Sequence, residues 1–460
     1  MFLARLLDEE TMGLYFIALM VVFLLKIVSD MGIDLAFVKQ YPAQTEQGKS
    51  NLLRSAFAIR LASCVFFSLI YILIEQSGKV SFINDIAHVT LLTLAMYWMH
   101  SFRELLLRLL QSEKIFTVYA GVQVLAAILK ALLVLSLLTI KEVSVEMVLM
   151  VEVFAFAASI FYAASRVREK IFTALSSKFL GGIELLRFGY PLYLNALLNL
   201  GNEKVSQYIV AGFGGPITMA YFGIAERLSD AGTRLFESFA NVYYPSQTGH
   251  FANNQKQMAT DMAVRSMMWV SFIIAGAIVG FTILREPVIK IFFTEKYLST
   301  ANAAVMFFGV LLFRSTQTLM GYFGVAAGQK FLPVKVSTVS SVVNIIACFA
   351  MFKWYGYQGA IAALLITQLL MNALYYTWLR RANLPIDITP LITICCVCIC
   401  CVALSYALHN YFLISLFLFP IYVVTCIWAL PDLRSDLLEL NHKATTIIQK
   451  RFNSSLTKKA

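Results

Sequence analysis

The chain has 460 residues, of which 59% are hydrophobic and only 14% are charged, and its formal net charge is +11. An ordinary soluble domain holds about 25% charged residues, and its core does not accommodate so many apolar side chains. The composition therefore excludes a water-soluble globular domain and predicts an all-α polytopic membrane protein.

Apolar runs long enough to cross about 30 Å of hydrocarbon recur along the whole chain and predict about 13 spans. The connections between them are short, so no sizeable water-soluble domain is expected. No cleavable signal segment is expected at the N-terminus. The runs cover residues 14–37, 53–74, 87–111, 117–139, 144–165, 185–211, 217–243, 265–283, 300–326, 333–352, 357–379, 389–408 and 411–430.

Lysine and arginine gather on alternate connections, and cytoplasmic connections are the ones that retain positive charge during insertion. This pattern predicts a cytoplasmic C-terminus whose basic tail lies near the anionic inner leaflet. With an odd number of spans, Met1 is then expected outside. The sparse external set consists of Arg5, Lys79, Lys141, Arg285, Lys290, Lys296 and Lys353.

A short internal similarity suggests a repeated architecture. Residues 11–18 and 218–225 share Thr, Met, Ile and Ala at the same spacing, although chance is an open alternative over eight positions. A true repeat predicts two helical bundles, the first of which lacks its first helix. The expected parts are an N-terminal lobe at 1–180, a C-terminal lobe at 181–382, and two extra helices with a basic tail at 383–460.

The helix expected at 217–243 carries a polar stripe. An ionised group at the bilayer centre costs at least about 2.5 kcal/mol, so such groups usually face a polar cavity or a partner. At 100° per residue the polar positions fall on one face. The stripe lines an aqueous path or, alternatively, forms a self-neutralised seam between helices. Its members are Gly223, Glu226, Arg227, Asp230, Arg234, Glu237 and Asn241.

Two further cations are expected near mid-span. Arg314 heads a face with Gln317 and three glycines, and it has no acidic residue within two turns. Lys130 likewise has no acidic residue close in sequence, so both predict an anion-binding role. Pairing of such a cation with Glu152 or Glu203, which are distant in sequence, is the open alternative.

Other polar positions in the apolar runs predict weaker candidates. Lys26, Asp30 and Asp34 recur every four residues, which favours a Lys-to-Asp pair with snorkelling of the lysine. Arg60 is also expected to snorkel, because it lies two turns from a cytoplasmic boundary. Asn195 and Asn199 form part of a polar face on a helix that Pro191 is expected to bend. Five of the eight cysteines lie within residues 394–401 and read as apolar filler rather than a metal or lipid-attachment site.

Several segments resemble the polysaccharide (O-antigen, Wzx-type) flippases of the multidrug/oligosaccharidyl-lipid/polysaccharide exporter superfamily. The resemblance runs through most of the chain, and its motifs are short. They are residues 3–15 (LARLLDEETMGLY), 29–40 (SDMGIDLAFVKQ), 187–191 (RFGYP), 203–204 (EK), 221–228 (YFGIAERL) and 244–245 (YP).

The resemblance implies two six-helix lobes around a central cavity, which move an undecaprenyl-pyrophosphate-linked oligosaccharide across the bacterial inner membrane. On this reading Lys130, Arg227, Arg234 and Arg314 attract the pyrophosphate, with Gln317, Asn195 and Asn199 beside them. Asp30, Glu152 and Glu226 are the expected coupling residues. The expected partners are membrane lipids, a polysaccharide polymerase and export machinery, with no nucleic acid and no cofactor. Such proteins begin with another helix before residue 3, which this chain is expected to lack.

Two other functions fit an apolar polytopic chain. A cation-coupled multidrug antiporter of the same fold is the nearer one, but organic cations prefer a cavity with unpaired acids. A membrane-embedded glycan polymerase or ligase is the other. It needs a substantial external loop, whereas the longest external connection expected here is 284–299, and no metal or nucleophile constellation appears in the sequence. The chain is therefore expected to be a transporter rather than an enzyme.

Overall fold

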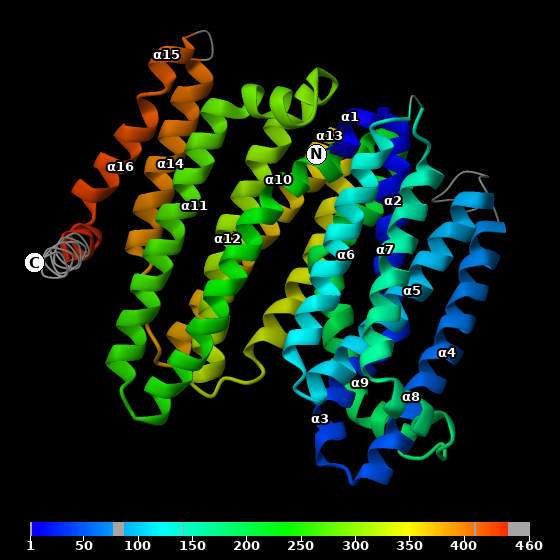
Figure 1. Cartoon of the computed structure of the whole chain (residues 1–460). Helices are drawn as coiled ribbons and strands as arrows, with labels where there is room; N and C mark the ends of the chain where they lie inside the picture. The colour runs from blue at the N-terminus through cyan, green and yellow to red at the C-terminus, as the bar shows by residue number, and fades with distance from the viewer. Residues whose placement is uncertain (1, 77–86, 141, 409–410, 440–460) are drawn as a thin grey trace, which may run out of the picture. The chain divides into compact units, whose positions relative to one another are not determined.

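The computed structural model describes residues 2–76, 87–140, 142–408 and 411–439, and the regular elements of this part are helical (Figure 1). The all-α expectation is confirmed. The helices are α1 (Phe2–Leu6), α2 (Glu9–Asp30), α3 (Ile33–Gln40), α4 (Glu46–Gln76), α5 (Ala87–Ser112), α6 (Phe116–Leu137), α7 (Val145–Arg166), α8 (Arg168–Leu175), α9 (Gly182–Glu203), α10 (Val205–Ala252), α11 (Lys256–Phe292), α12 (Ala301–Ala326), α13 (Leu332–Arg381), α14 (Thr389–Ala407), α15 (Phe412–Ser415) and α16 (Leu418–Ala429), with short 3₁₀ turns at Tyr41–Ala43 and Glu295–Thr300.

Ten helical stretches in the described part are long and apolar enough to cross a membrane. Two of them, α10 and α13, are interrupted by a glycine with non-helical backbone angles: Gly215 has φ 73° and Gly356 has φ 59°. The break in α13 falls between the apolar runs predicted at 333–352 and 357–379. The break in α10 falls just before the run predicted at 217–243. The total of about 13 crossings stays a prediction.

The chain forms two compact units, and each unit is built from three segments that are not consecutive in the sequence. Unit 1 consists of Met1–Ile224, Lys290–Leu298 and Ser337–Leu364. Unit 2 consists of Ala225–Ile289, Ser299–Val336 and Leu365–Ala460. The predicted sequence boundaries after residues 180 and 382 stay predictions.

The core of unit 1 is built where α3, α4 and α5 meet. Phe37, Leu53, Leu105 and Leu109 are fully or almost fully buried in one apolar cluster. Figure 1 shows α5 running beside α7, and the two helices pack together along much of their length. Apolar contact along several helices fixes the positions from which the polar side chains of this unit project.

The cysteine-rich segment contributes to the core of unit 2. Cys398 and Cys401 of α14 are buried with Tyr422 and Cys426 of α16 in an apolar cluster that also includes residues of α11. All eight cysteines are free thiols. Their surroundings are those of small apolar side chains, as the apolar-filler interpretation expects.

The two similar segments of the sequence pack against each other within unit 1. A Cβ atom placed on Gly13 would lie 1.8 Å from the carbonyl oxygen of Pro216, and one placed on Gly223 would lie 2.6 Å from the ring of Phe16. Both glycines therefore allow an approach of α2 to α10 that any larger residue would block. The similarity thus coincides with a close helix contact.

Helix α2 starts and stops at residues with defined capping roles. The Asp8 carboxylate accepts the Thr11 amide N–H at 2.9 Å. Hydrogen bonding with the Thr11 side chain, and to a smaller extent with this amide, holds the pKa of Asp8 below its usual range. At the other end, Met31 and Gly32 both adopt left-handed backbone angles, so the chain turns directly into α3. The turn brings Gly32 against Gly189 of α9.

Replacing Gly32 by alanine is expected to destabilise the protein by about 2 kcal/mol or more. Its φ of +77° disfavours any side chain, and the added Cβ would lie 2.1 Å from the Gly189 carbonyl oxygen. The midpoint of thermal unfolding of the purified chain measures the effect. Gly249→Ala is the matched control, because no atom lies within 4 Å of its Cβ position. Equal midpoints for the two variants would contradict the tight contact.

Candidate functional site

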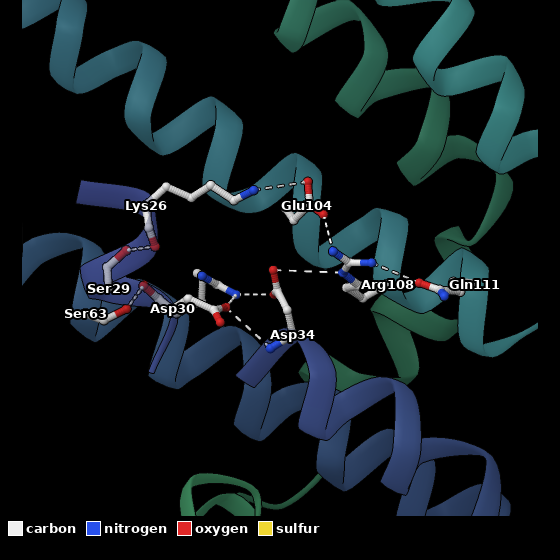
Figure 2. Close-up of polar contacts among 9 residues, drawn as sticks. Lys26, Ser29, Asp30, Asp34, Ser63, Glu104, Arg108 and Gln111 are labelled. Carbon is white, nitrogen blue, oxygen red and sulfur yellow. Dashed lines mark hydrogen bonds and ion pairs between the residues drawn. The ribbon is translucent and has the colours of Figure 1, made fainter. Parts of the chain in front are cut away.

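Unit 1 holds a network of ion pairs that joins α2, α3, α4 and α5. We call it the six-residue network, and its members are Lys26, Asp30, Asp34, Arg60, Glu104 and Arg108. Figure 2 shows Lys26 and Arg108 approaching Glu104 from two sides, at 3.6 Å and 2.7 Å. Arg108 also lies 3.9 Å from Asp34. Three cations and three carboxylates share this site, so its formal charge is balanced.

Arg60 is the most enclosed member of the six-residue network, with a side chain that is 0% exposed. Its Nη2 donates to Asp30 at 2.8 Å and also to Asp34. Its Nε and Nη1 are buried and have no hydrogen-bond partner among the described residues. One nitrogen therefore makes both ion pairs, and the guanidinium is not held as a bidentate fork.

Two expectations about this region are wrong. Lys26 pairs with Glu104 of α5 and not with Asp30, and Arg60 does not snorkel toward water. A pair between residues four apart on an exposed helix contributes only about 0.3–0.5 kcal/mol. Burying an arginine without a counter-ion destabilises a protein by far more than this. The carboxylates of Asp30 and Asp34 therefore pair with Arg60 rather than with Lys26.

A second charged site joins α2, α6 and α7 in unit 1, and we call its members Tyr15, Lys130 and Glu152 the triad. Lys130 forms an ion pair with Glu152, and its ammonium also donates to the Tyr15 hydroxyl at 3.3 Å. The Tyr15 hydroxyl in turn donates to Glu152 at 2.6 Å. The Glu152 side chain is 3% exposed, whereas that of Lys130 is 40% exposed. The carboxylate thus anchors an ammonium that other groups can reach.

The interpretation of Lys130 as an unpaired cation is therefore corrected. Of the two distant acids considered as partners, the structure selects Glu152. It does so because α6 and α7 pack side by side, which brings together residues that are far apart in the chain. The side chain of Glu203 lies outside the described residues. The contact joins a predicted substrate residue to a predicted coupling residue.

The predicted stripe of α10 lies mostly in unit 2. Arg227 is half-exposed and pairs with Asp230 of its own helix at 3.4 Å, as the self-neutralised alternative expects. Arg234 is exposed, and Glu226 is half-buried with an interaction partner of its own. Gly223 faces Phe16 in unit 1 rather than open space. The stripe is therefore partly neutralised along its length.

The second predicted face, on α12, belongs to unit 2 as well. Arg314 is half-buried and has an interaction partner, while the Gln317 Oε1 is buried without a hydrogen-bond partner in the described part of the chain. Gly232 of α10 packs closely against Leu311 of α12. The two helices that carry Arg234 and Arg314 are therefore neighbours in this unit.

The remaining predicted residues fall into two groups. Asn195 and Asn199 lie in α9, but their side chains are outside the described residues. Asp30 and Glu152, predicted for coupling, each lie in an ion pair with a basic residue of another helix. The predicted residues are thus divided between the six-residue network, the triad and the α10 and α12 faces.

Tyr15, Glu104 and Arg108 take part in these sites and were not predicted. Glu104 and Arg108 stand four residues apart on one helix, a spacing that signals a pair on a shared face. Both lie near the end of the apolar run predicted at 87–111. Tyr15 offers no such signal, since a lone phenol in an apolar helix reads as a packing residue.

The fold is that of membrane transporters and flippases. It is similar to the lipid II flippase MurJ in an inward closed conformation, with a TM-score of 0.71 and 16% identity over 94% of this chain and 96% of that chain. An inward-facing multidrug resistance MATE family transporter of the MOP superfamily gives a TM-score of 0.62 and 14% identity over 80% of this chain and 89% of that one. Such low identities show a shared fold alone.

A comparison of the sequence with protein families identifies the family of this chain. The model of the polysaccharide biosynthesis protein family matches residues 2–302, and the chain belongs to that family. The resemblance noted in the sequence is thereby confirmed. Compared by sequence with curated proteins, the chain matches none of them.

Proposed function

We propose that this protein is a flippase that moves an undecaprenyl-pyrophosphate-linked oligosaccharide across the bacterial inner membrane for surface polysaccharide or O-antigen assembly. Membership of the polysaccharide biosynthesis protein family supports the pathway, and the fold shared with a lipid II flippase supports the type of movement. A polysaccharide polymerase and export machinery are the proposed partners, and the C-terminus is proposed to be cytoplasmic.

The observation that carries the proposal is the partly exposed ammonium of Lys130 within a helix long enough to cross a membrane. Lipid excludes an isolated phosphate, whereas a fixed cation stabilises it. Glu152 and Tyr15 hold the ammonium in one place, so a pyrophosphate meets a preorganised donor. The other proposed contacts with the substrate are Arg227, Arg234, Arg314, Gln317, Asn195 and Asn199.

The triad also offers a route to coupling. A pyrophosphate that binds Lys130 competes with Glu152 for the same ammonium. If the anion takes the ammonium, Glu152 is left as a buried carboxylate with Tyr15 as its donor, and uptake of a proton relieves the cost of that charge. Binding of cargo and binding of a proton are thereby linked. Asp30 and Glu226 are the other proposed coupling residues.

The second candidate function is a cation-coupled multidrug antiporter, which the likeness to MATE transporters favours. An organic cation requires a carboxylate that is available for pairing. The buried carboxylates of Asp34 and Glu152 already have basic partners in the structure. The charges of the sites therefore fit an anionic cargo better.

Replacing Arg314 by alanine is expected to reduce surface polysaccharide by at least about tenfold in a host that lacks its own flippase, because a charge-assisted contact contributes about 1.5–3 kcal/mol. Immunoblotting of surface polysaccharide, normalised to protein level, measures the effect. Arg381→Ala is the matched control, since it removes an exposed arginine from the end of α13.

Two results would count against the proposal. One is unchanged polysaccharide for both Arg314→Ala and Lys130→Ala at normal protein level. The other is resistance to cationic drugs conferred on a pump-deficient strain, without restored polysaccharide, which would favour the antiporter.

A further inference from the structure

A pocket at the end of α11 in unit 2 is lined by none of the candidate site residues described above. Its volume is about 280 Å³, and α11, α14 and α15 contribute its walls. The polar residues that line it are Thr282, Arg285, Glu286, Ser405 and Ser415, and Phe412 lies beside them. In the orientation predicted from the lysine and arginine distribution, this end of α11 faces outward.

Arg285 is the unusual member of this pocket, because it is only 8% exposed. Its Nη1 donates to the Thr282 carbonyl at 3.0 Å, and its guanidinium carbon lies 4.3 Å from the centre of the Tyr406 ring. Among the described residues, no carboxylate lies within ion-pair distance of it. A guanidinium carries five N–H donors, so most of them are available to a molecule in the pocket.

The hydroxyl groups around Arg285 suit the same kind of ligand. Ser405 is 4% exposed and has no hydrogen-bond partner in the part of the chain that the structure describes. Its hydroxyl lines the pocket, where it can donate to an anionic oxygen of a bound ligand. Thr282 and Ser415 donate to carbonyls of their own helices, so they leave the donor role to Arg285 and Ser405.

The surface next to the pocket is apolar. Phe412 and Leu413 of α15 are 45% and 75% exposed, and Phe417 just after this helix is 68% exposed. In a chain that spans a membrane, such side chains lie against acyl chains. A ligand that places an anion on Arg285 and hydrocarbon on this surface has the chemistry of a membrane phospholipid.

We propose that the pocket of Arg285 and Ser405 binds the phosphodiester of a phospholipid headgroup. Arg285 donates hydrogen bonds to two oxygens of the phosphate. The Ser405 hydroxyl donates a third hydrogen bond to the same phosphate. The site holds a lipid of the surrounding membrane, and none of the residues proposed to contact the cargo lines it.

The test uses the purified full-length chain in detergent and native mass spectrometry. Phosphatidylethanolamine, phosphatidylglycerol, diacylglycerol with the same acyl chains and inorganic phosphate are the probes. We expect both phospholipids to bind the unaltered chain, and Arg285→Gln to weaken them by at least about tenfold. Lys290→Gln is the matched control, because it removes an exposed cation of the same helix that pairs with Glu295.

Ser405→Leu is the second variant, which fills the pocket and keeps the guanidinium. We expect it to weaken both phospholipids also, so the proposal is testable even where Arg285→Gln does not fold. Inorganic phosphate that binds the unaltered chain and competes with the phospholipids would identify the free anion as the ligand of the same site. Equal binding of diacylglycerol, or phospholipid binding that both pocket variants retain in full, would overturn the proposal.

Discussion

Replacing Lys130 by alanine is expected to destabilise unit 1 by about 2–3 kcal/mol and to abolish transport. The Glu152 carboxylate, 3% exposed, loses its cation and keeps only the Tyr15 hydroxyl. Loss of one partner of a fully buried pair costs about 3–5 kcal/mol, and the 40% exposure of Lys130 reduces this figure. Thermal unfolding of the purified chain and surface polysaccharide in the host measure the two effects.

A charge-exchanged variant separates the two roles of this lysine. Lys130→Glu combined with Glu152→Lys retains an ion pair, so stability is expected to recover in part. Transport is not expected to recover, because the group that is proposed to bind a pyrophosphate is now negative. Lys353→Ala, at an exposed position of α13, is the control for simple loss of a lysine. Full transport by the exchanged variant would show that the pair is structural.

Replacing Arg60 by methionine is expected to destabilise the protein by about 3–5 kcal/mol, whereas lysine at this position is expected to be tolerated. Methionine leaves Asp30 and Asp34 without the cation that both contact. Lysine suffices because one nitrogen, Nη2, makes both ion pairs, and the other guanidinium nitrogens have no partner in the described residues. Arginine and lysine are not interchangeable at bidentate sites, but this site is not bidentate.

The unfolding midpoints of Arg60→Met and Arg60→Lys, measured side by side, check this expectation. Arg168→Met is the matched control, since it removes an exposed arginine from the start of α8. Combining Arg60→Met with Asp30→Asn and Asp34→Asn is expected to restore part of the stability, because no buried charge is then left unpaired. A lysine variant as unstable as the methionine variant would refute the single-nitrogen account.

The helices of this fold were predictable because lipid imposes a minimum length on apolar runs. The break at Gly356 illustrates the strength of that signal. The run lengths separate 333–352 from 357–379, although the backbone there forms one helix interrupted at a single glycine. The distribution of lysine and arginine also predicts the orientation of the chain in the membrane. This orientation is set during membrane insertion and does not depend on how the helices pack.

The partners of the charged residues were much less predictable. Helical periodicity indicates which residues share a face, and it placed Arg227 and Asp230, which form an ion pair, on one stripe. It does not state which face of another helix lies opposite. Lys26 therefore was assigned to Asp30 on its own helix, whereas packing against α5 gives it Glu104. Pairing across helices depends on tertiary contacts that one sequence does not encode by spacing.

The glycine contacts of unit 1 have a consequence for how this protein can vary. At Gly13, Gly32 and Gly223 the neighbouring helix leaves space for a hydrogen atom and nothing larger. Charged residues can be replaced by others while the helices keep their spacing. The cargo preference can therefore change without a change in the packing of the helices. A related protein with a different cargo would be expected to retain glycine at these three positions, because the helix spacing does not depend on the cargo.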